Sequence, residues 1–108
     1  MPHNLNKIFK SIADPTRREI FHLLVLASSA LSITQISQHF EISRQGITKH
    51  IRMLRDAGLI DMTEKGREHF CLANVKPLKA IQDWVQLYER FWDNKLKSLG
   101  DHLDQKNK

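Results

Sequence analysis

The chain has 108 residues, of which 41% are hydrophobic and 27% are charged. This length and composition are typical of one folded globular domain, spanning residues 1–108, and argue against disorder. Seventeen Lys and Arg against twelve Asp and Glu give a net charge of +5, which favours a polyanionic partner but does not require one. The lone cysteine rules out a disulfide within the chain, and no apolar run is long enough for a membrane span, so a cytoplasmic protein is expected.

The first third of the chain predicts two helices. Apolar residues recur at helical spacing at four positions: Leu5, Ile8, Phe9 and Ile12. Asp14 followed by Pro15 has the form of an N-cap and a first helical residue, which predicts a second helix over residues 15–27. Arg17 and Arg18 then fall on its first turn, where they are either solvated or available to a phosphate or an acidic neighbour. Residues 27–31 are expected to form a loop.

The stretch from Thr34 to Gly58 predicts a helix-turn-helix. Ser32 with Gln35 three residues later has the form of a capping box, so a short helix is expected over residues 33–40. After a turn of about three residues, Ser43 can cap a second helix. Gly58 stands where that helix would end in the left-handed region.

The second helix of this motif has two different faces. Ile47, Ile51 and Leu54 form an apolar stripe. The opposite face carries an amide, a hydroxyl and two cations without a carboxylate, from Gln45, Thr48, Lys49 and Arg52. Such a face suits phosphates and base edges together, whereas an ordinary solvated face mixes its charge signs. The pattern therefore indicates a recognition helix.

A β-hairpin is predicted directly after this helix. Residues 59–63 and 68–72 have strand-like patterns and flank a glycine-containing turn. A hairpin in this place is a wing, and its tip presents Lys65 and Arg67, which can reach a phosphate backbone or a minor groove. An ordinary solvated turn remains the alternative for these two residues.

The longest helix is expected from about Lys76 to the end of the chain. Apolar residues recur along this helix at alternating spacings of three and four, as in a coiled coil: Leu78, Ile81, Val85, Tyr88, Trp92, Leu96, Leu99 and Leu103. Three further residues widen this apolar face: Trp84, Leu87 and Phe91. So large an apolar face indicates an interface, which we interpret as a homodimer contact, with packing inside one chain as the alternative. The predicted interface comprises Trp84, Val85, Tyr88, Phe91, Trp92, Leu96 and Leu99, joined by Leu5, Ile8, Phe9 and Ile12 of the first helix.

These motifs together resemble the ArsR family of bacterial winged-helix repressors. The resemblance is carried by residues 12–20 (IADPTRREI), 43–51 (SRQGITKHI), Leu54, 57–60 (AGLI) and Gly66-Arg67, while Phe91-Trp92 with Leu96 and Leu99 is similar to a branch without metal boxes. It implies a mainly α fold of about five helices with a small hairpin wing, assembled as a homodimer on palindromic double-stranded DNA. It also implies DNA contacts at Ser43, Arg44, Gln45, Thr48, Lys49 and His50.

The chain departs from the metal-sensing members of that family. The helix before the recognition helix has no cysteine pair, Asp83 lacks a histidine two residues on, and His102 is isolated. We therefore expect no metal site and no cofactor, and the effector stays unknown. Cys71 fits a small buried hydrophobe better than a redox switch. For Gly46, inside the recognition helix, close approach to the DNA backbone is one possible reason.

An enzyme is not expected, because the sequence contains no phosphate loop, paired carboxylates or activated nucleophile. The sequence instead predicts a homodimeric, sequence-specific transcriptional repressor that does not respond to metals. Two alternatives stay open. One is a winged helix used only for protein contacts, since the fold does not determine function, and the other is a metal- or redox-responsive repressor.

Overall fold

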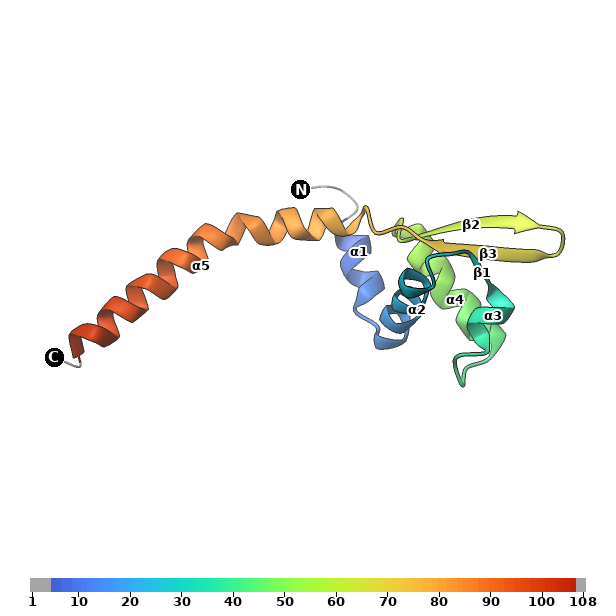
Figure 1. The fold of residues 1–108 in the computed structure, drawn as a ribbon, viewed down its shortest axis with the longest axis horizontal. Coiled ribbons are helices and arrows are strands. Elements are labelled where there is room, and N and C mark those ends of the chain that lie inside the picture. The colour runs from blue at the N-terminus through green and yellow to red at the C-terminus, as the bar shows by residue number, and fades with distance from the viewer. Residues whose placement is uncertain (1–4, 107–108) are drawn as a thin grey trace. The chain divides into compact units, whose positions relative to one another are not determined.

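The structure, a computed structural model, describes the backbone of residues 5–106 and the side chains of residues 5–100. Within this range the chain forms five helices and three strands (Figure 1): α1 (Leu5–Ile12), α2 (Pro15–Ala27), β1 (Leu31–Ser32), α3 (Ile33–Ser37), α4 (Arg44–Asp56), β2 (Ile60–Lys65), β3 (Glu68–Ala73) and α5 (Leu78–Lys106). The chain divides into two compact units, the first ending at Leu78 and the second beginning at Lys79. The predicted mainly α winged fold is confirmed.

The start of α2 is defined by its N-cap. The Asp14 carboxylate accepts a hydrogen bond from the backbone N–H of Arg17 at 3.0 Å, and Pro15 occupies the first turn as predicted. This hydrogen bond, together with the positive charge of Arg17, holds the pKa of Asp14 below its ordinary value. The charged carboxylate also suits the positive end of the helix dipole.

α3 begins at the predicted capping box but is shorter than predicted. The backbone N–H of Gln35 donates to Ser32 Oγ at 3.1 Å, and the backbone N–H of Ser32 donates to Gln35 Oε1 at 2.8 Å. The helix ends at Ser37 rather than at Phe40, because the next residues form tighter bonds of the i to i−3 kind, such as Phe40 N–H to Ser37 O.

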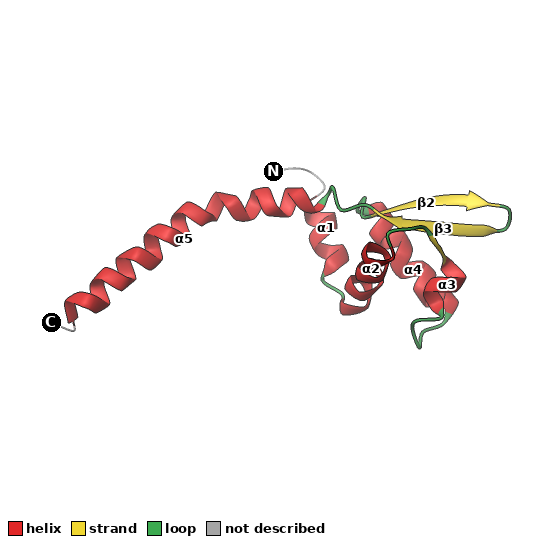
Figure 2. Cartoon of the chain, in the orientation of Figure 1, coloured by secondary structure: helices red, strands yellow, loops and turns green. Residues whose placement is uncertain are grey.

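The hairpin is part of a three-stranded antiparallel sheet of order β1–β3–β2. β1 was not predicted: Leu31 pairs with Cys71 and Ser32 with Phe70, so the expected loop ends before Leu31. Two residues are too few to show strand periodicity, and only β3 reveals them as a strand. β2 and β3 run side by side in Figure 2.

The turn at the tip of the wing is tighter than predicted. Glu64 pairs with His69 and Lys65 with Glu68, so the loop consists of Gly66 and Arg67 alone. Gly66 has φ +63°, which a two-residue hairpin loop of the type II′ kind requires at its first position.

The hydrophobic core of the first unit lies between the helices and the sheet. Its fully buried side chains come from each of α1 to α4 and from the segment that leads into and forms the sheet: Leu5, Ile8, Ile20, Leu24, Ile36, Ile47, Ile51, Leu54, Leu59, Ile60 and Cys71. Burying one such aliphatic side chain stabilises the fold by roughly 1.5–3 kcal/mol. This core holds α4 in place and leaves its other face to solvent.

Gly46 lies close to the turn that precedes α4. A Cβ built on Gly46 would lie 2.8 Å from Cγ2 of Ile42 and 3.3 Å from Oγ of Ser43. Two carbon atoms do not come within 2.8 Å of each other, so a Cβ at position 46 would force the Ile42 side chain or the backbone to move. The branched Ile42 side chain is stiff. This close approach is internal to the helix-turn-helix, and the suggested approach of a DNA backbone to Gly46 stays a prediction.

Replacing Gly46 by Ala is therefore expected to bring no gain in stability, although Ala favours a helix interior by about 1 kcal/mol. In an Ile42→Ala background the clash is absent, and the same change should raise the free energy of unfolding by up to about 1 kcal/mol. Urea denaturation of the four proteins of this double-mutant cycle measures the coupling. An equal effect of Gly46→Ala in both backgrounds would show that Ile42 does not impose the glycine.

The long helix α5 begins at Leu78 rather than at about Lys76, and all of it from Lys79 onward belongs to the second unit. Within this helix, Trp84 and Tyr88 pack edge to face with ring centroids 5.3 Å apart, and the Lys95 ammonium lies 5.5 Å from the centre of the Phe91 ring. Its large apolar side chains are 43–72% exposed, namely Val85, Leu87, Tyr88, Phe91, Trp92, Leu96 and Leu99.

Candidate nucleic-acid interface

α4 presents one face to the core and the other to solvent, as its sequence predicts. Ser43 caps the helix, because its Oγ accepts a hydrogen bond from the backbone N–H of Gly46 at 3.1 Å. Ile47, Ile51 and Leu54 are completely buried. Gly58, with φ +81°, follows the helix in the left-handed region. These contacts hold the polar residues of α4 on a rigid support, which a recognition surface needs.

The opposite face of α4 forms a shallow open depression of about 590 Å³. It is lined by five of the predicted DNA-binding residues: Arg44, Gln45, Thr48, Lys49 and Arg52. Three of them carry positive charge and none is acidic, so the surface attracts a polyanion while offering an amide and a hydroxyl for specific hydrogen bonds. The structure therefore brings these five side chains together.

The hydroxyl of Thr48 is already engaged as a donor. It donates to the carbonyl oxygen of Arg44 at 2.8 Å, one turn back along α4. Its remaining lone pairs can only accept a hydrogen bond. At a base edge Thr48 therefore suits a donor such as an exocyclic amino group, or offers its methyl group to a thymine.

A second depression, of about 270 Å³, joins α4 to the wing. Thr48 and Arg52 line it as well as the first, together with wing residues that include Glu64 and His69. The acid-free character of α4 thus does not extend to the wing residues beside it. Lys65 and Arg67 lie exposed at the wing tip, where the register of β2 and β3 also places the exposed Glu68 opposite Lys65, so the tip carries both charge signs.

His50 does not lie on the same face as Gln45 and Lys49. It is half-buried, and its Nδ1 lies 3.3 Å from Nη1 of Arg17. An arginine can only donate, so Nδ1 is the acceptor. The side chain is thus turned toward Arg17 of α2, and a DNA contact of His50 stays a prediction.

Arg17 and Arg18 have a structural role that the sequence did not reveal. Nε of Arg17 donates to the carbonyl oxygen of Ser11 at 2.7 Å and Nη2 to that of Lys10 at 3.1 Å, while Nη1 of Arg18 donates to that of Ile12 at 2.7 Å. Both guanidinium groups thus satisfy carbonyls at the C-terminal end of α1, where positive charge is favoured. The sequence predicted solvation, a phosphate contact or an acidic neighbour for these two residues and did not predict these carbonyl contacts.

The dimer residues predicted on α1 divide into two pairs. Leu5 and Ile8 are each 1% exposed, so they belong to the chain's own core and offer no surface to a second copy. That part of the prediction is wrong, because helical spacing identifies an apolar face without saying what covers it. Phe9 and Ile12 are half-buried and keep part of their surface.

Metal-ligating side chains are dispersed in this structure. Among the residues that it describes, no three of the His, Cys, Asp and Glu side chains cluster as a metal site would need. Cys71 is fully buried in β3, and burial raises the pKa of its thiol to about 11, so the group stays a thiol near neutral pH. Of the helices in the described range, none has the length and apolarity to cross a bilayer.

The fold and the cationic face of α4 define a winged helix-turn-helix DNA-binding protein. Residues 12–63 match a family model described as a helix-turn-helix domain. The chain is 33% identical over 92 residues to the transcriptional repressor SdpR of Bacillus subtilis, covering 85% of this chain and all of that protein. The chain belongs to the ArsR family of transcriptional regulators.

The solved structures that are similar to this one include two winged helix-turn-helix proteins. An ArsR-like transcriptional regulator from Rhodococcus sp. RHA1 matches with a TM-score of 0.71 and 27% identity, over 89% of each chain. The homodimeric winged helix-turn-helix DNA-binding domain of a possible ArsR-family regulator from Mycobacterium bovis matches with a TM-score of 0.63 and 16% identity, over 80% of this chain and 81% of that one. At that identity the second likeness concerns the fold alone.

Proposed function

We propose that this protein is a homodimeric transcriptional repressor that binds a palindromic operator through α4 and the wing. The observation that carries the proposal is the exposed face of α4, where Arg44, Gln45, Thr48, Lys49 and Arg52 line one depression without an acidic group. A winged helix that serves only protein contacts has no need of such a face. The name of its Bacillus subtilis relative supports repression rather than activation.

Each part of the surface has its own role in this proposal. Gln45 and Arg44 read base edges, and Lys49 and Arg52 neutralise phosphates. Ser43, at the start of α4, keeps a hydroxyl proton for a phosphate, while its oxygen caps the helix. Lys65 and Arg67 contact the backbone or the adjacent minor groove. A regulator of this kind acts beside the chromosome, so we place it in the cytoplasm.

Dimerisation rests on α5. Seven large apolar side chains of this helix are 43–72% exposed, which is far more apolar surface than a monomeric protein keeps in contact with water. The Mycobacterium bovis neighbour is described as homodimeric. Trp84, although half-buried, belongs to the same interface, as do Phe9 and Ile12 of α1. Residues 1–108 thus act as one DNA-binding module with dimerisation helices at both ends.

Selection of DNA fragments by the purified protein, followed by fluorescence anisotropy, tests the proposal. We expect one enriched palindrome, bound at least about 10³-fold more tightly than random duplex, with an affinity that falls steeply as salt rises. Without enrichment and without salt dependence, a protein-contact function would replace the proposed one.

No three metal-ligating side chains cluster among the described residues, so stoichiometric zinc, cadmium or arsenite should leave the complex of protein and operator intact. A release of DNA by these metals that depends on Cys71 would overturn this prediction.

A further inference from the structure

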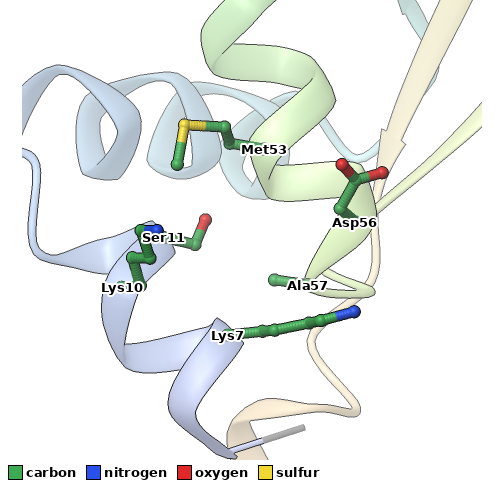
Figure 3. Close-up of a pocket in the computed structure, with 6 residues that line it drawn as sticks. All are labelled: Lys7, Lys10, Ser11, Met53, Asp56 and Ala57. Atoms are coloured by element: carbon green, nitrogen blue, oxygen red, sulfur yellow. The ribbon is translucent and has the colours of Figure 1, made fainter.

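A small pocket lies between α1 and the C-terminal end of α4 (Figure 3). Its volume is about 280 Å³, which is near the lower end of the range for small-molecule sites. It is lined by Lys7, Lys10 and Ser11 of α1 and by Met53, Asp56 and Ala57 at the end of the recognition helix. None of these residues lines the DNA-binding face described above, so the pocket is separate from that face.

Ser11 is the unusual residue of this pocket. It is 1% exposed, and its Oγ has no hydrogen-bond partner among the described residues. Figure 3 shows the hydroxyl directed from α1 toward α4. An unpaired buried hydroxyl costs stability, and nearly all buried polar groups in proteins find a partner. A ligand oxygen that accepts this hydrogen bond would recover the loss.

The charge around the pocket favours an anion. Lys7 and Lys10 both come from α1; in Figure 3 the Lys7 side chain extends past Ala57 toward the end of α4, while that of Lys10 stays beside Ser11. The single acidic residue that lines it, Asp56, has its carboxylate 3.4 Å from the Arg55 guanidinium, which offsets its charge. The side chain of Met53 and the methyl group of Ala57 add an apolar wall. A ligand that fits all three features carries a carboxylate on a small apolar body.

We propose that this pocket binds a small organic carboxylate, whose oxygens pair with Lys7 and Lys10 and accept the hydrogen bond of Ser11. Such a ligand joins α1 to the end of α4 that carries Met53, one residue after Arg52 of the DNA-binding face. Occupancy of the pocket therefore changes the DNA affinity, and DNA changes the ligand affinity by the same factor. This second step rests on the proposed function, whereas binding of the carboxylate does not.

Binding is tested by titrating the full-length protein with benzoate and recording amide chemical shifts by NMR. We expect saturable shifts with a millimolar dissociation constant, centred on residues 7–11 and 53–57. Benzamide, which has the same shape without the charge, should produce none of them. Inorganic phosphate, an anion without an apolar body, should bind more weakly than benzoate.

Two variants, Ser11→Ala and a double variant of Lys7 and Lys10, test whether the Ser11 hydroxyl binds a ligand or has only a structural role. Ser11→Ala should abolish the benzoate shifts and raise the thermal midpoint of the free protein by a few degrees, because it removes an unpaired buried group from a helix. Lys7→Gln with Lys10→Gln should weaken benzoate at least tenfold. The matched double variant Lys76→Gln with Lys79→Gln removes two exposed cations outside the pocket and should leave the shifts unchanged.

Several results would overturn the inference. These are the absence of saturable shifts at tens of millimolar benzoate, equal shifts with benzamide, and shifts that persist in Ser11→Ala. If benzoate binds here but leaves operator affinity unchanged, the regulatory step is wrong and the ligand site stands. If the protein binds no DNA even without benzoate, the proposed function fails, while the NMR result on the pocket is unaffected.

Discussion

Changing Trp92 and Leu96 together to Gln is expected to convert the protein to a monomer and to abolish tight operator binding. Both side chains are more than half exposed and lie one turn apart on the apolar side of α5. A single recognition helix contacts only a few base pairs, whereas two related by a two-fold axis read half-sites about 34 Å apart. Loss of the second module therefore removes most of the affinity.

Sedimentation equilibrium beside fluorescence anisotropy measures this result. Arg90→Gln with Asn94→Gln is the matched control, because these exposed residues are also one turn apart but lie on the other side of α5. The control should remain dimeric with unchanged affinity. NMR or circular dichroism distinguishes a folded monomer from a chain that unfolds when the dimer is lost. A monomeric wild-type protein at micromolar concentration, or a monomeric variant that binds the palindrome as well as wild type, would contradict the dimer.

Gln45→Ala and Lys49→Ala are expected to weaken DNA binding in different ways, although both residues line the same depression. The amide of Gln45 can pair bidentately with an adenine, so its loss should reduce discrimination between operator and random DNA by about 1–3 kcal/mol. The ammonium of Lys49 acts as a point charge. Its loss should weaken both DNAs alike and reduce the slope of log affinity against log salt by about one unit.

The two neighbouring residues extend the same comparison. Arg44→Ala should resemble Gln45→Ala, because a guanidinium can pair bidentately with a guanine, and Arg52→Ala should resemble Lys49→Ala. Lys76→Ala is the control for loss of charge alone, since this exposed lysine lines neither depression on α4. If all four variants at the α4 face lose the same discrimination, the division into base-reading and phosphate-binding residues is wrong.

The contacts of Arg17 give α4 a second support outside the core. This side chain binds two carbonyls at the end of α1 and also lies 3.3 Å from His50 on α4. The pocket of Ser11 lies between the same two helices. Both features connect α1 to the recognition helix, so α1 is well placed to influence how that helix meets DNA.

The sequence alone determined those features that depend on neighbouring residues. Asp14-Pro15, the pair Ser32 and Gln35, Ser43 and Gly58 mark the helix ends correctly, because a cap acts within about four residues. The apolar stripe and the acid-free face of α4 follow from the period of one helix, which predicted four of the five residues that line its depression, while Arg44 came from the family resemblance.

Only the tertiary structure decided what each face meets. Helical spacing marked Leu5 and Ile8 as apolar, and their burial within the chain shows that they are core residues. β1 exists because β3 pairs with it, and Gly46 is needed because the preceding turn brings Ile42 against it. The unpaired hydroxyl of Ser11 likewise becomes visible only when α4 is packed over α1. These features join residues that are distant in sequence or meet across a turn, and local periodicity carries no information about such contacts.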